Sequence, residues 1–351
     1  MSDHLPDEEW VQGRADEEAH FQVQDALRSM ARPATDFLRW PWADLDAMTG
    51  GMGPGTTHYV VGFSGMGKTT FICSALDRWA KAGIGIDVLP LELKPDTFRA
   101  YMACQAAGID PGLMMSGDYK LLPNADDLFK QARAALIEQK ARQAIRVHEA
   151  AFVDVEKLEA ACSDAQIRGA QVVVVDHIDH VSAEGKSDIQ ISHAVNKAAF
   201  RIAKEYNLVL ILMSQANNDA LKVNNDHLAK FQPLRETSVW MGALKRQVCT
   251  SMLGLFRPVR APLPGETPDE YKLAMHKAKS GEEPPGSMLI PQRAGLNLMK
   301  SRNYGAREGQ RVQLAVRHGY YDDLNDSERL DTQARTHGIR TSSGLRLERP
   351  A

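Results

Sequence analysis

Short apolar runs alternate with amphipathic segments along the middle of the chain. The runs HYVVG at 58–62 and GIDVLPLE at 85–92 predict buried strands. Between them, FICSALDRWAKAG at 71–83 repeats its apolar residues at helical spacing and ends in a glycine, so it predicts a helix. Strand, helix and strand at this spacing predict a parallel βαβ unit.

The same alternation continues toward the C-terminus. QVVVVD at 171–176 is a continuous apolar run, the pattern of a strand that is covered on both faces of a parallel sheet, and LVLILMSQ at 208–215 predicts another. The segment 188–207 between them predicts a helix, whose apolar face consists of Ile191, Val195, Ala198, Ile202 and Ala203. Residues 124–168 carry mostly helical patterns. We therefore predict an α/β fold with a doubly wound, mostly parallel sheet.

The chain divides into one long central domain and two polar ends. Residues 1–36 are polar and alanine-rich and predict a tail with one short helix, and residues 323–351 predict a mobile C-terminal tail. The pattern of a folded core runs from 37 to 322. Within it, residues 258–292 are rich in Pro, Gly and charged residues, which predicts a surface insertion.

Composition places the protein among ordinary globular chains. Its 351 residues are 43% hydrophobic and 25% charged, which excludes wholesale disorder and fibrous architectures. With a formal net charge of -3, any polyanionic partner must be bound by a local cluster of Lys and Arg. The sequence has neither a leader pattern nor an apolar run of membrane-helix length. We expect a soluble protein of the cytoplasm, or of the host cytoplasm if the source is a virus, without membrane contact.

Residues 62–69, GFSGMGKT, fit the pattern GxxxxGK[ST] at every fixed position. Because this pattern follows a predicted strand and opens a predicted helix, it predicts a loop that binds the phosphates of ATP. Lys68 is expected to pair with the β and γ phosphates, and the Thr69 hydroxyl to bind Mg²⁺. A glycine-rich turn that binds nothing is the alternative. The candidate nucleotide-binding residues are Gly62, Ser64, Gly65, Met66, Gly67, Lys68, Thr69 and Thr70.

Two carboxylates are candidates for the chemistry beside this loop. Asp176 ends a predicted buried strand, where a carboxylate is hard to justify without a partner. It is the candidate second Mg²⁺ ligand. Glu92 ends a run that we expect to lie beside the loop strand, and it is the candidate group that orients or deprotonates the attacking water. Two alternatives stay open: a metal site within DHIDH at 176–180, and a Glu92 that is only solvated.

With these residues identified, the sequence resembles the RecA-like motor domain of DnaB-type hexameric replicative helicases, including the helicase half of phage primase-helicases and mitochondrial Twinkle. The resemblance covers most of residues 37–322. It implies a RecA-like P-loop NTPase fold. The segments that carry it are WADLDAMTGGMGPG, GFSGMGKTT, LPLELKPD, VVVVDHIDHVSAEGKSD, LILMSQANN, LRETS and MKSRN.

The resemblance implies roles for residues outside the loop. Gln215 in LILMSQANN would sense the γ-phosphate and couple it to DNA. Lys300 and Arg302 in MKSRN would reach the ATP of a neighbouring subunit, where an arginine stabilises the charge that develops in phosphoryl transfer. A solvated basic turn is the alternative. Catalysis in trans requires a head-to-tail ring of identical subunits, which is a hexamer in the resembled family.

The resemblance also implies single-stranded DNA as a partner, bound in the ring through its phosphates. The candidate loops are 183–188 and 216–233, and LRETS follows the second of them. Ordinary polar loops are the alternative, because no aromatic residue is clearly placed to stack on bases. The candidate DNA-binding residues are Lys186, Lys222, Lys230 and Arg235.

We therefore predict an ATP hydrolase that works as a ring-forming DNA helicase or translocase in phage or cellular DNA replication. The alternatives are a RecA-like recombinase or regulatory DNA-binding ATPase without unwinding, and a loader or adaptor with little turnover. The sequence lacks the N-terminal domain and the primase module of the resembled proteins, so a separate primase or loader is a further candidate partner. The acidic stretch that the family carries after LRETS is replaced by VWMGALKRQVCTSML.

Overall fold

The computed structural model describes most of the central domain and part of the segment that follows it. The described residues are 37–149, 152–185, 187–217, 228, 231–235, 239, 241–263, 265–302, 307–317, 319–326 and 328–329. The described residues from Arg39 onward belong to one compact unit. Within the described ranges, no helix combines the length and apolar character that crossing a membrane requires.

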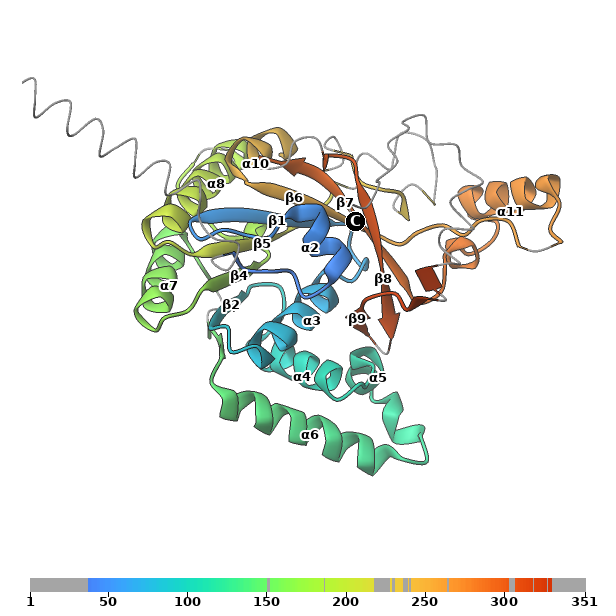
Figure 1. Ribbon diagram of the computed structural model, residues 1–351, viewed down its shortest axis with the longest axis horizontal. Helices are drawn as coiled ribbons and strands as arrows, with labels where there is room; N and C mark the ends of the chain where they lie inside the picture. The colour runs from blue at the N-terminus through green and yellow to red at the C-terminus, as the bar shows by residue number, and fades with distance from the viewer. Residues whose placement is uncertain are drawn as a thin grey trace, which may run out of the picture. The chain divides into compact units, whose positions relative to one another are not determined.

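A single mixed sheet forms the centre of the fold (Figure 1). In the described chain its strands follow the order β3-β2-β4-β5-β1-β6-β7-β8-β9. The pairs from β3 to β6 are parallel, and those from β6 to β9 are antiparallel. The predicted α/β fold with a mostly parallel sheet is confirmed. The strands are β1 (Thr56–Gly62), β2 (Ile86–Pro90), β3 (Ile145–Val147), β4 (Val172–Asp176), β5 (Val209–Gln215), β6 (Ser251–Phe256), β7 (Arg293–Ser301), β8 (Arg311–Arg317) and β9 (Tyr320–Asp322).

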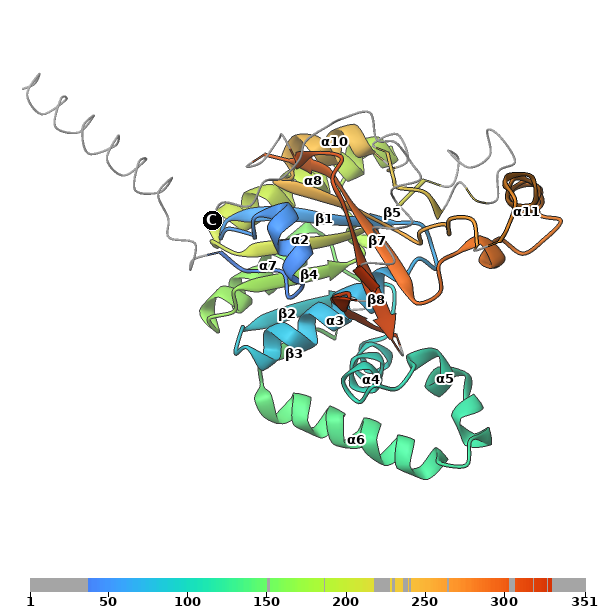
Figure 2. The same cartoon turned by 45° about the vertical axis from the view of Figure 1, so that its right-hand side comes forward.

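Helices pack on both faces of the sheet (Figures 1 and 2). Helix α3 contacts β1, β9 and α4, whereas α8 contacts β1 and β5 and is flanked by α7 and α10. Helix α6 packs on α4. The helices are α2 (Ala43–Thr49), α3 (Lys68–Lys81), α4 (Pro95–Ala106), α5 (Pro111–Ser116), α6 (Ala125–Arg142), α7 (Val155–Ile167), α8 (Asp188–Glu205), α10 (Gly242–Val248) and α11 (Pro268–Ser280), with short 3-10 turns η2 (Asp118–Leu121), η3 (Ile178–His180) and η6 (Pro285–Met288).

The main core lies between the sheet and the α7–α8 face. Val173 of β4 and Leu210 of β5 pack in one cluster with Leu158 of α7 and Val195 of α8. The apolar face predicted for the helix at 188–207 is confirmed, since Val195 and Ile202 are buried there. The continuous apolar runs became central strands because both of their faces are covered, so no polar face was needed.

The position of β2 differs from the expectation for Glu92. We expected the strand before Glu92 to lie beside the loop strand β1, but β4 and β5 separate the two. That expectation was wrong because order along the chain does not fix order in a doubly wound sheet: the chain crosses over a helix and can skip positions that later strands fill. β2 pairs instead with β4, so Pro90 lies opposite Asp176.

The edge strand β3 was not expected. The segment 124–168 reads as helical, yet Ile145–Val147 pairs with β2 between α6 and α7. Three residues are too few for a period of two to be recognised against helical neighbours. The strand depends on the exposed edge of β2, which only the tertiary structure provides.

The segment predicted as a surface insertion, 258–292, carries structure of its own. Helix α11 begins with a capping box in which Thr267 and Glu270 exchange hydrogen bonds. Ala278 and Met288 are buried. Apolar residues on an otherwise polar segment therefore anchor it, and a capped helix spans its middle.

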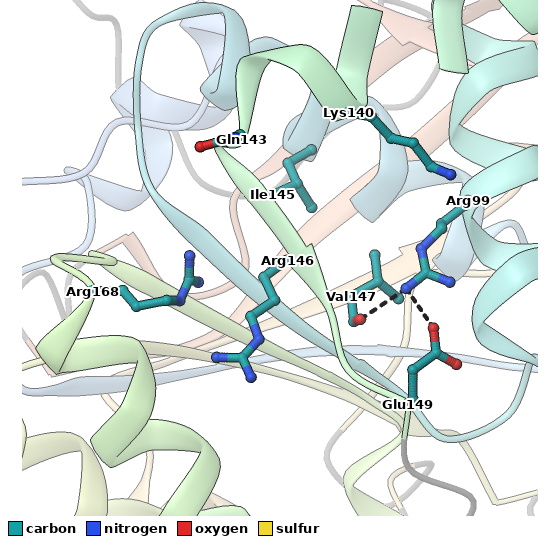
Figure 3. A pocket seen from close by; sticks show the side chains of 8 residues that line it. All are labelled: Arg99, Lys140, Gln143, Ile145, Arg146, Val147, Glu149 and Arg168. Atoms are coloured by element: carbon teal, nitrogen blue, oxygen red, sulfur yellow. Dashed lines mark hydrogen bonds and ion pairs between the residues drawn. The ribbon is translucent and has the colours of Figure 1, made fainter. Parts of the chain in front are cut away.

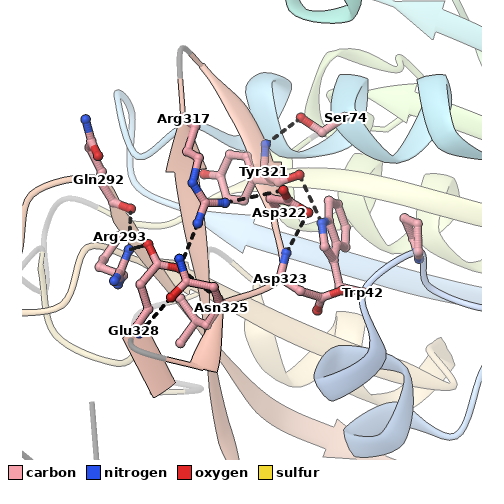
Figure 4. Close-up of polar contacts among 12 residues, drawn as sticks. Trp42, Ser74, Gln292, Arg293, Arg317, Tyr321, Asp322, Asp323, Asn325 and Glu328 are labelled. Carbon is pink, nitrogen blue, oxygen red and sulfur yellow. Dashed lines mark hydrogen bonds and ion pairs between the residues drawn. The ribbon is translucent and has the colours of Figure 1, made fainter. Parts of the chain in front are cut away.

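The packed part of the chain extends past Asp322, where a mobile tail was expected to begin. Leu324 is buried, and Glu328 forms ion pairs of 2.9 Å with Arg293 and 2.7 Å with Arg317 (Figure 4). Both arginines lie on strands, Arg293 on β7 and Arg317 on β8. The first turn after the sheet is therefore tied to it.

Candidate functional site

The loop between β1 and α3 has the geometry of an anion cradle. Gly65 and Gly67 have φ values of 77° and 91°, in the left-handed region that favours glycine. Helix α3 begins at Lys68, and none of the described side chains caps its first turn. The first amides of a helix lack partners within the helix, so they and the positive end of the helix dipole suit a phosphate.

The candidate nucleotide-binding residues lie together along this loop. Gly62 ends β1, Ser64 and Gly65 are exposed, and Met66 is buried. Thr70 lies in the first turn of α3, where its hydroxyl is 2.8 Å from the Tyr101 hydroxyl. The loop therefore exposes backbone at its tip, while its two ends are held by a strand and a helix.

Lys68 lies along the loop that it is expected to serve. Its ammonium donates to the carbonyl of Gly62 at 3.0 Å, and the carbonyl of Phe63 is 3.4 Å away. Burial lowers the pKa of Lys68, and the nearby carboxylates of Asp176 and Glu92 oppose that shift. A cation in this position faces the loop's interior, where the β and γ phosphates of a nucleotide would lie.

Asp176 and Thr69 bring two hard oxygen donors together. The Thr69 hydroxyl donates to Asp176 Oδ2 at 2.9 Å, which joins the first turn of α3 to the end of β4. The other oxygen, Asp176 Oδ1, is buried and accepts no hydrogen bond from the described residues. Burial raises the pKa of Asp176. A buried carboxylate oxygen that accepts no hydrogen bond from the described residues, beside a hydroxyl, fits Mg²⁺, which prefers oxygen ligands.

Glu92 reaches this pair although its strand is not beside β1. The backbone amide of Glu92 donates to the carbonyl of Asp176 at 3.0 Å. Its carboxylate Oε2 lies 2.8 Å from His177 Nε2, which is 3.4 Å from Asp176 Oδ1. The Glu92 side chain is 46% exposed, so solvent reaches it from one side. The carboxylate therefore borders both the buried pair and water.

The residues of DHIDH separate into two groups. Donor atoms of Glu92, Asp176 and His177 lie within 4.8 Å of one another, a spacing that a metal ion could use. Asp179 instead accepts hydrogen bonds from the Ser214 hydroxyl and from the backbone amide of Gln215. The five residues at 176–180 therefore do not converge on one point.

Gln215 ends β5 beside the phosphate loop. In the parallel pairing of β1 and β5 it lies opposite Gly62. Its backbone amide donates to Asp179 Oδ2 at 3.1 Å. The position therefore borders the loop from the neighbouring strand.

Lys300 and Arg302 lie at the other end of the sheet. In the sheet, Lys300 on β7 lies opposite Met252 on β6. The residue before Met252, Ser251, lies opposite His58 on β1. His58 precedes Gly62 by four residues, so this level is about 13 Å along the strand from the loop. Neither side chain is therefore positioned to serve the phosphate loop of its own chain.

The side chains of Lys300 and Arg302 contact backbone carbonyls near α10. Lys300 donates to the carbonyl of Arg246, and Arg302 donates to the carbonyls of Gln247 and Cys249, the latter at 2.9 Å. The predicted basic element is therefore held against the segment that joins α10 to β6.

Most of the candidate DNA-binding residues lie outside the described residues, namely Lys186, Lys222 and Lys230. Arg235 is described and exposed. It lines a hollow of about 480 Å³ with Arg246 and Arg311, next to β7. Three arginines around one hollow form a local basic patch of the kind that the net charge of the chain does not provide by itself.

A second basic hollow, of about 620 Å³, lies at the sheet edge (Figure 3). Arg146 on β3 and Lys140 on α6 line it together with Arg99 and Arg168. Arg99 is paired with Glu149 at 2.6 Å, and Arg168 is paired with the buried Asp87. Its lining includes none of the candidate site residues.

Sequence reasoning missed two contributions to the site. Tyr321 of β9 donates from its hydroxyl to the carbonyl of Gly67 at 3.3 Å, and a Cβ at Gly67 would lie 2.8 Å from that hydroxyl. Lys245 of α10 pairs with Asp179 at 2.6 Å. The first contact joins residues 254 positions apart, which no motif links. The contact of Lys245 with Asp179 had one signal in the sequence. The segment after LRETS carries basic residues at the place where the resembled family carries acidic ones.

The phosphate loop after β1, the carboxylates after β2 and β4, and the order of the parallel strands define a P-loop protein with a RecA-like fold. Residues 38–243 match the family described as DnaB-like helicase C terminal domain. This match spans more than half of the 351 residues, so the chain belongs to that family. The resemblance inferred from the motifs is thereby confirmed.

Several solved structures are similar in fold. A solved ATPase domain is 15% identical, with a TM-score of 0.64, over 88% of this chain and 98% of its own. A DnaB-like replicative helicase studied for its interactions with primase is 16% identical, with a TM-score of 0.63, over 88% of this chain and 67% of its own. A KaiC-like protein from Pyrococcus horikoshii OT3 is 13% identical, with a TM-score of 0.52, over 82% of this chain and 99% of its own. No curated protein matches the sequence.

Proposed function

We propose that the protein is an ATP-driven DNA helicase or translocase that moves on single-stranded DNA and hydrolyses ATP between the subunits of a ring. The observation that carries the proposal is the convergence of Lys68, Thr69, Asp176 and Glu92 at the phosphate loop. Membership in a helicase family gives this ATPase site its context. Family membership alone does not supply the substrate, so DNA is part of the proposal.

Each group at the loop has a proposed role. The α3 amides and Lys68 bind the phosphates, and Thr69 and Asp176 hold Mg²⁺. Bound Mg²⁺ neutralises charge on the phosphates. Glu92, which borders both Asp176 and solvent, orients the attacking water and accepts its proton. Gln215, opposite Gly62 in the sheet, responds to the γ-phosphate.

The proposed ring supplies what one chain lacks at its own loop. Lys300 and Arg302 lie on the sheet end opposite to the loop, as residues that serve a neighbour's ATP would. Around α5 and α6 several apolar side chains are exposed, which favours an interface with another copy. They are Met115, Leu121, Phe129 and Ile137. A head-to-tail ring, hexameric by family resemblance, would use both surfaces.

Single-stranded DNA is the proposed polyanionic partner. Arg235 with Arg246 and Arg311 gives one subunit a basic hollow, and a ring repeats that hollow around its axis. Lys186, Lys222 and Lys230 are further proposed phosphate contacts. A separate primase or loader is a proposed protein partner, because the described fold accounts for a motor domain alone.

The test is steady-state ATP hydrolysis by the full chain with and without single-stranded DNA. We expect DNA to stimulate turnover, and Lys68→Ala to lower it at least about 100-fold because a preorganised phosphate contact is lost. Lys272→Ala, at a side chain that is 76% exposed on α11, is the matched control and should behave as wild type. Stimulated turnover with no strand displacement would favour the recombinase or regulatory alternative. Turnover that ignores DNA would contradict the proposal.

A further inference from the structure

Lys245 is a cation with no access to solvent. Its side chain has 0% exposure, and its ammonium lies 2.6 Å from Asp179 Oδ1 and 2.6 Å from the Ser214 hydroxyl. Lysine is almost never fully buried without a partner, because desolvation of the charge costs about as much as a close ion pair returns. The partner is less buried, since the Asp179 side chain is 20% exposed. The pair is therefore weak evidence for stability, and a role in positioning is the hypothesis to test.

Asp179 extends the contact from Lys245 to the end of β5. Its second oxygen, Oδ2, accepts from the Ser214 hydroxyl at 2.8 Å and from the Gln215 backbone amide at 3.1 Å. One carboxylate therefore holds the backbone of Gln215 on one side and the ammonium of Lys245 on the other. The hydroxyl of Ser214 closes the network, because it contacts both charged groups.

Lys245 also lies just after the segment that contains candidate DNA contacts. In the sequence, that segment lies between Gln215, which ends β5, and Gly242, which begins α10. A bridge between Ala216 and Val239 joins its two ends. The candidate residues Lys222 and Lys230 fall between these ends in the sequence. Lys245 thus adds a side-chain contact from α10 to Ser214 on the strand that borders the phosphate loop.

We propose that Lys245 is a positioning residue that holds Gln215 against the phosphate loop through Asp179. The inference rests on the proposed function, in which Gln215 responds to the γ-phosphate. The pairing of Gln215 with Gly62 explains why a small shift of this network would reach the nucleotide.

The test is a double-mutant cycle between Lys245→Met and Gln215→Ala in the full chain, read as kcat and KM for ATP. We expect Lys245→Met to lower kcat about tenfold with little change in KM, since the nucleotide contacts of the loop remain. If Lys245 acts through Gln215, the double variant should be within about twofold of Gln215→Ala alone. If the losses of kcat in the two single variants multiply in the double variant, the proposal is overturned.

A matched control separates positioning from general loss of stability. Arg168→Met likewise removes the cation from an ion pair, since Arg168 pairs with Asp87, which has 0% exposure and keeps His148 at 2.7 Å. We expect both single variants to lower the melting temperature, but only Lys245→Met to lower kcat. An equal loss of kcat in Arg168→Met would assign the effect to stability and overturn the positioning role.

Two further measurements keep the outcome decisive. If Lys245→Met does not fold, the cycle uses Asp179→Asn/Lys245→Met, which removes both charges and leaves no unpaired ion. If steady-state turnover is low, the cycle is read as the rate of single-turnover hydrolysis, where a double variant that matches Gln215→Ala supports the proposal and effects that multiply overturn it. A wild-type chain that hydrolyses ATP without DNA stimulation would contradict the proposed function, while the cycle would still decide the role of Lys245.

Discussion

At the scale of single residues, Glu92 differs from its neighbours in its access to water. Its side chain is 46% exposed, while that of Asp176 is 1% exposed, although His177 touches both. The exposed carboxylate can meet a solvent molecule, and the buried one can only meet what the loop holds. This division favours Asp176 as a proposed metal ligand and Glu92 as the proposed base.

This division predicts the effect of Glu92→Gln. The variant keeps the size and hydrogen-bonding reach of the side chain but cannot accept a proton, so turnover should fall at least about 100-fold while ATP binding persists. Single-turnover hydrolysis and equilibrium binding of a fluorescent ATP analogue measure the two effects. Glu205→Gln, at a half-exposed residue of α8, is the control. Near-normal turnover in Glu92→Gln would remove the assignment.

At the scale of elements, β1 carries a buried polar contact that joins it to β6. His58 Nδ1 lies 2.7 Å from the Ser251 hydroxyl, and Nε2 lies 2.7 Å from the Thr56 hydroxyl. Burial lowers the pKa of His58 to about 3, so the ring is neutral in the folded protein. In the neutral ring one nitrogen donates and the other accepts, and a hydroxyl can serve either role, so both ring nitrogens are satisfied without a charge.

The low pKa of His58 predicts a loss of stability in acid. The unfolded chain binds a proton near pH 6.5 and the folded chain only near pH 3, so the free energy of unfolding contributed by His58 is full above pH 6.5 and falls as the pH drops toward 3. The slope is about 1.4 kcal/mol per pH unit. Urea unfolding between pH 7 and 4.5 should give a steeper decline for wild type than for His58→Asn. Parallel declines would refute this prediction.

At the scale of the whole molecule, the sheet separates two groups of proposed catalytic residues. The phosphate loop, Asp176 and Glu92 follow the carboxyl ends of parallel strands, whereas Lys300 and Arg302 lie near the amino end of β6. One chain cannot bring both groups to the same nucleotide without rearranging its core. Two chains in a head-to-tail arrangement can.

This separation predicts recovery of activity in mixed rings. Arg302→Ala and Glu92→Gln should each abolish most turnover alone. Mixed in equal amounts, about a quarter of the interfaces pair an intact Glu92 with an intact Arg302, so ATP hydrolysis should return to about that fraction of wild type. Mixtures of Glu92→Gln with Lys68→Ala should recover no ATP hydrolysis. Both residues serve the same proposed site of one chain, so each subunit of such a ring carries a defective site. No recovery in rings shown to be mixed would argue against catalysis in trans.

Much of the fold and the core of the site could be predicted from local sequence. The phosphate loop from Gly62 to Thr69 depends on residues that are neighbours in the chain, and the glycines there adopt backbone angles that other residues rarely do. The strand ending in Asp176 could be recognised because complete burial requires a continuous apolar run. Local patterns therefore predicted most of the central elements, though not β3, and where the phosphates would bind.

Only the tertiary structure decided which elements meet. It put β4 and β5 between β1 and β2, so that Glu92 reaches the site through Asp176 and His177. It also buried Lys245 against Asp179. Residues make local patterns through their chain neighbours, but a crossover can return a strand to any free edge, and an ion pair between distant residues leaves no periodicity. Local sequence therefore predicted most of the central elements and the loop, whereas the packing of distant segments decided β3, the strand order and the rest of the site.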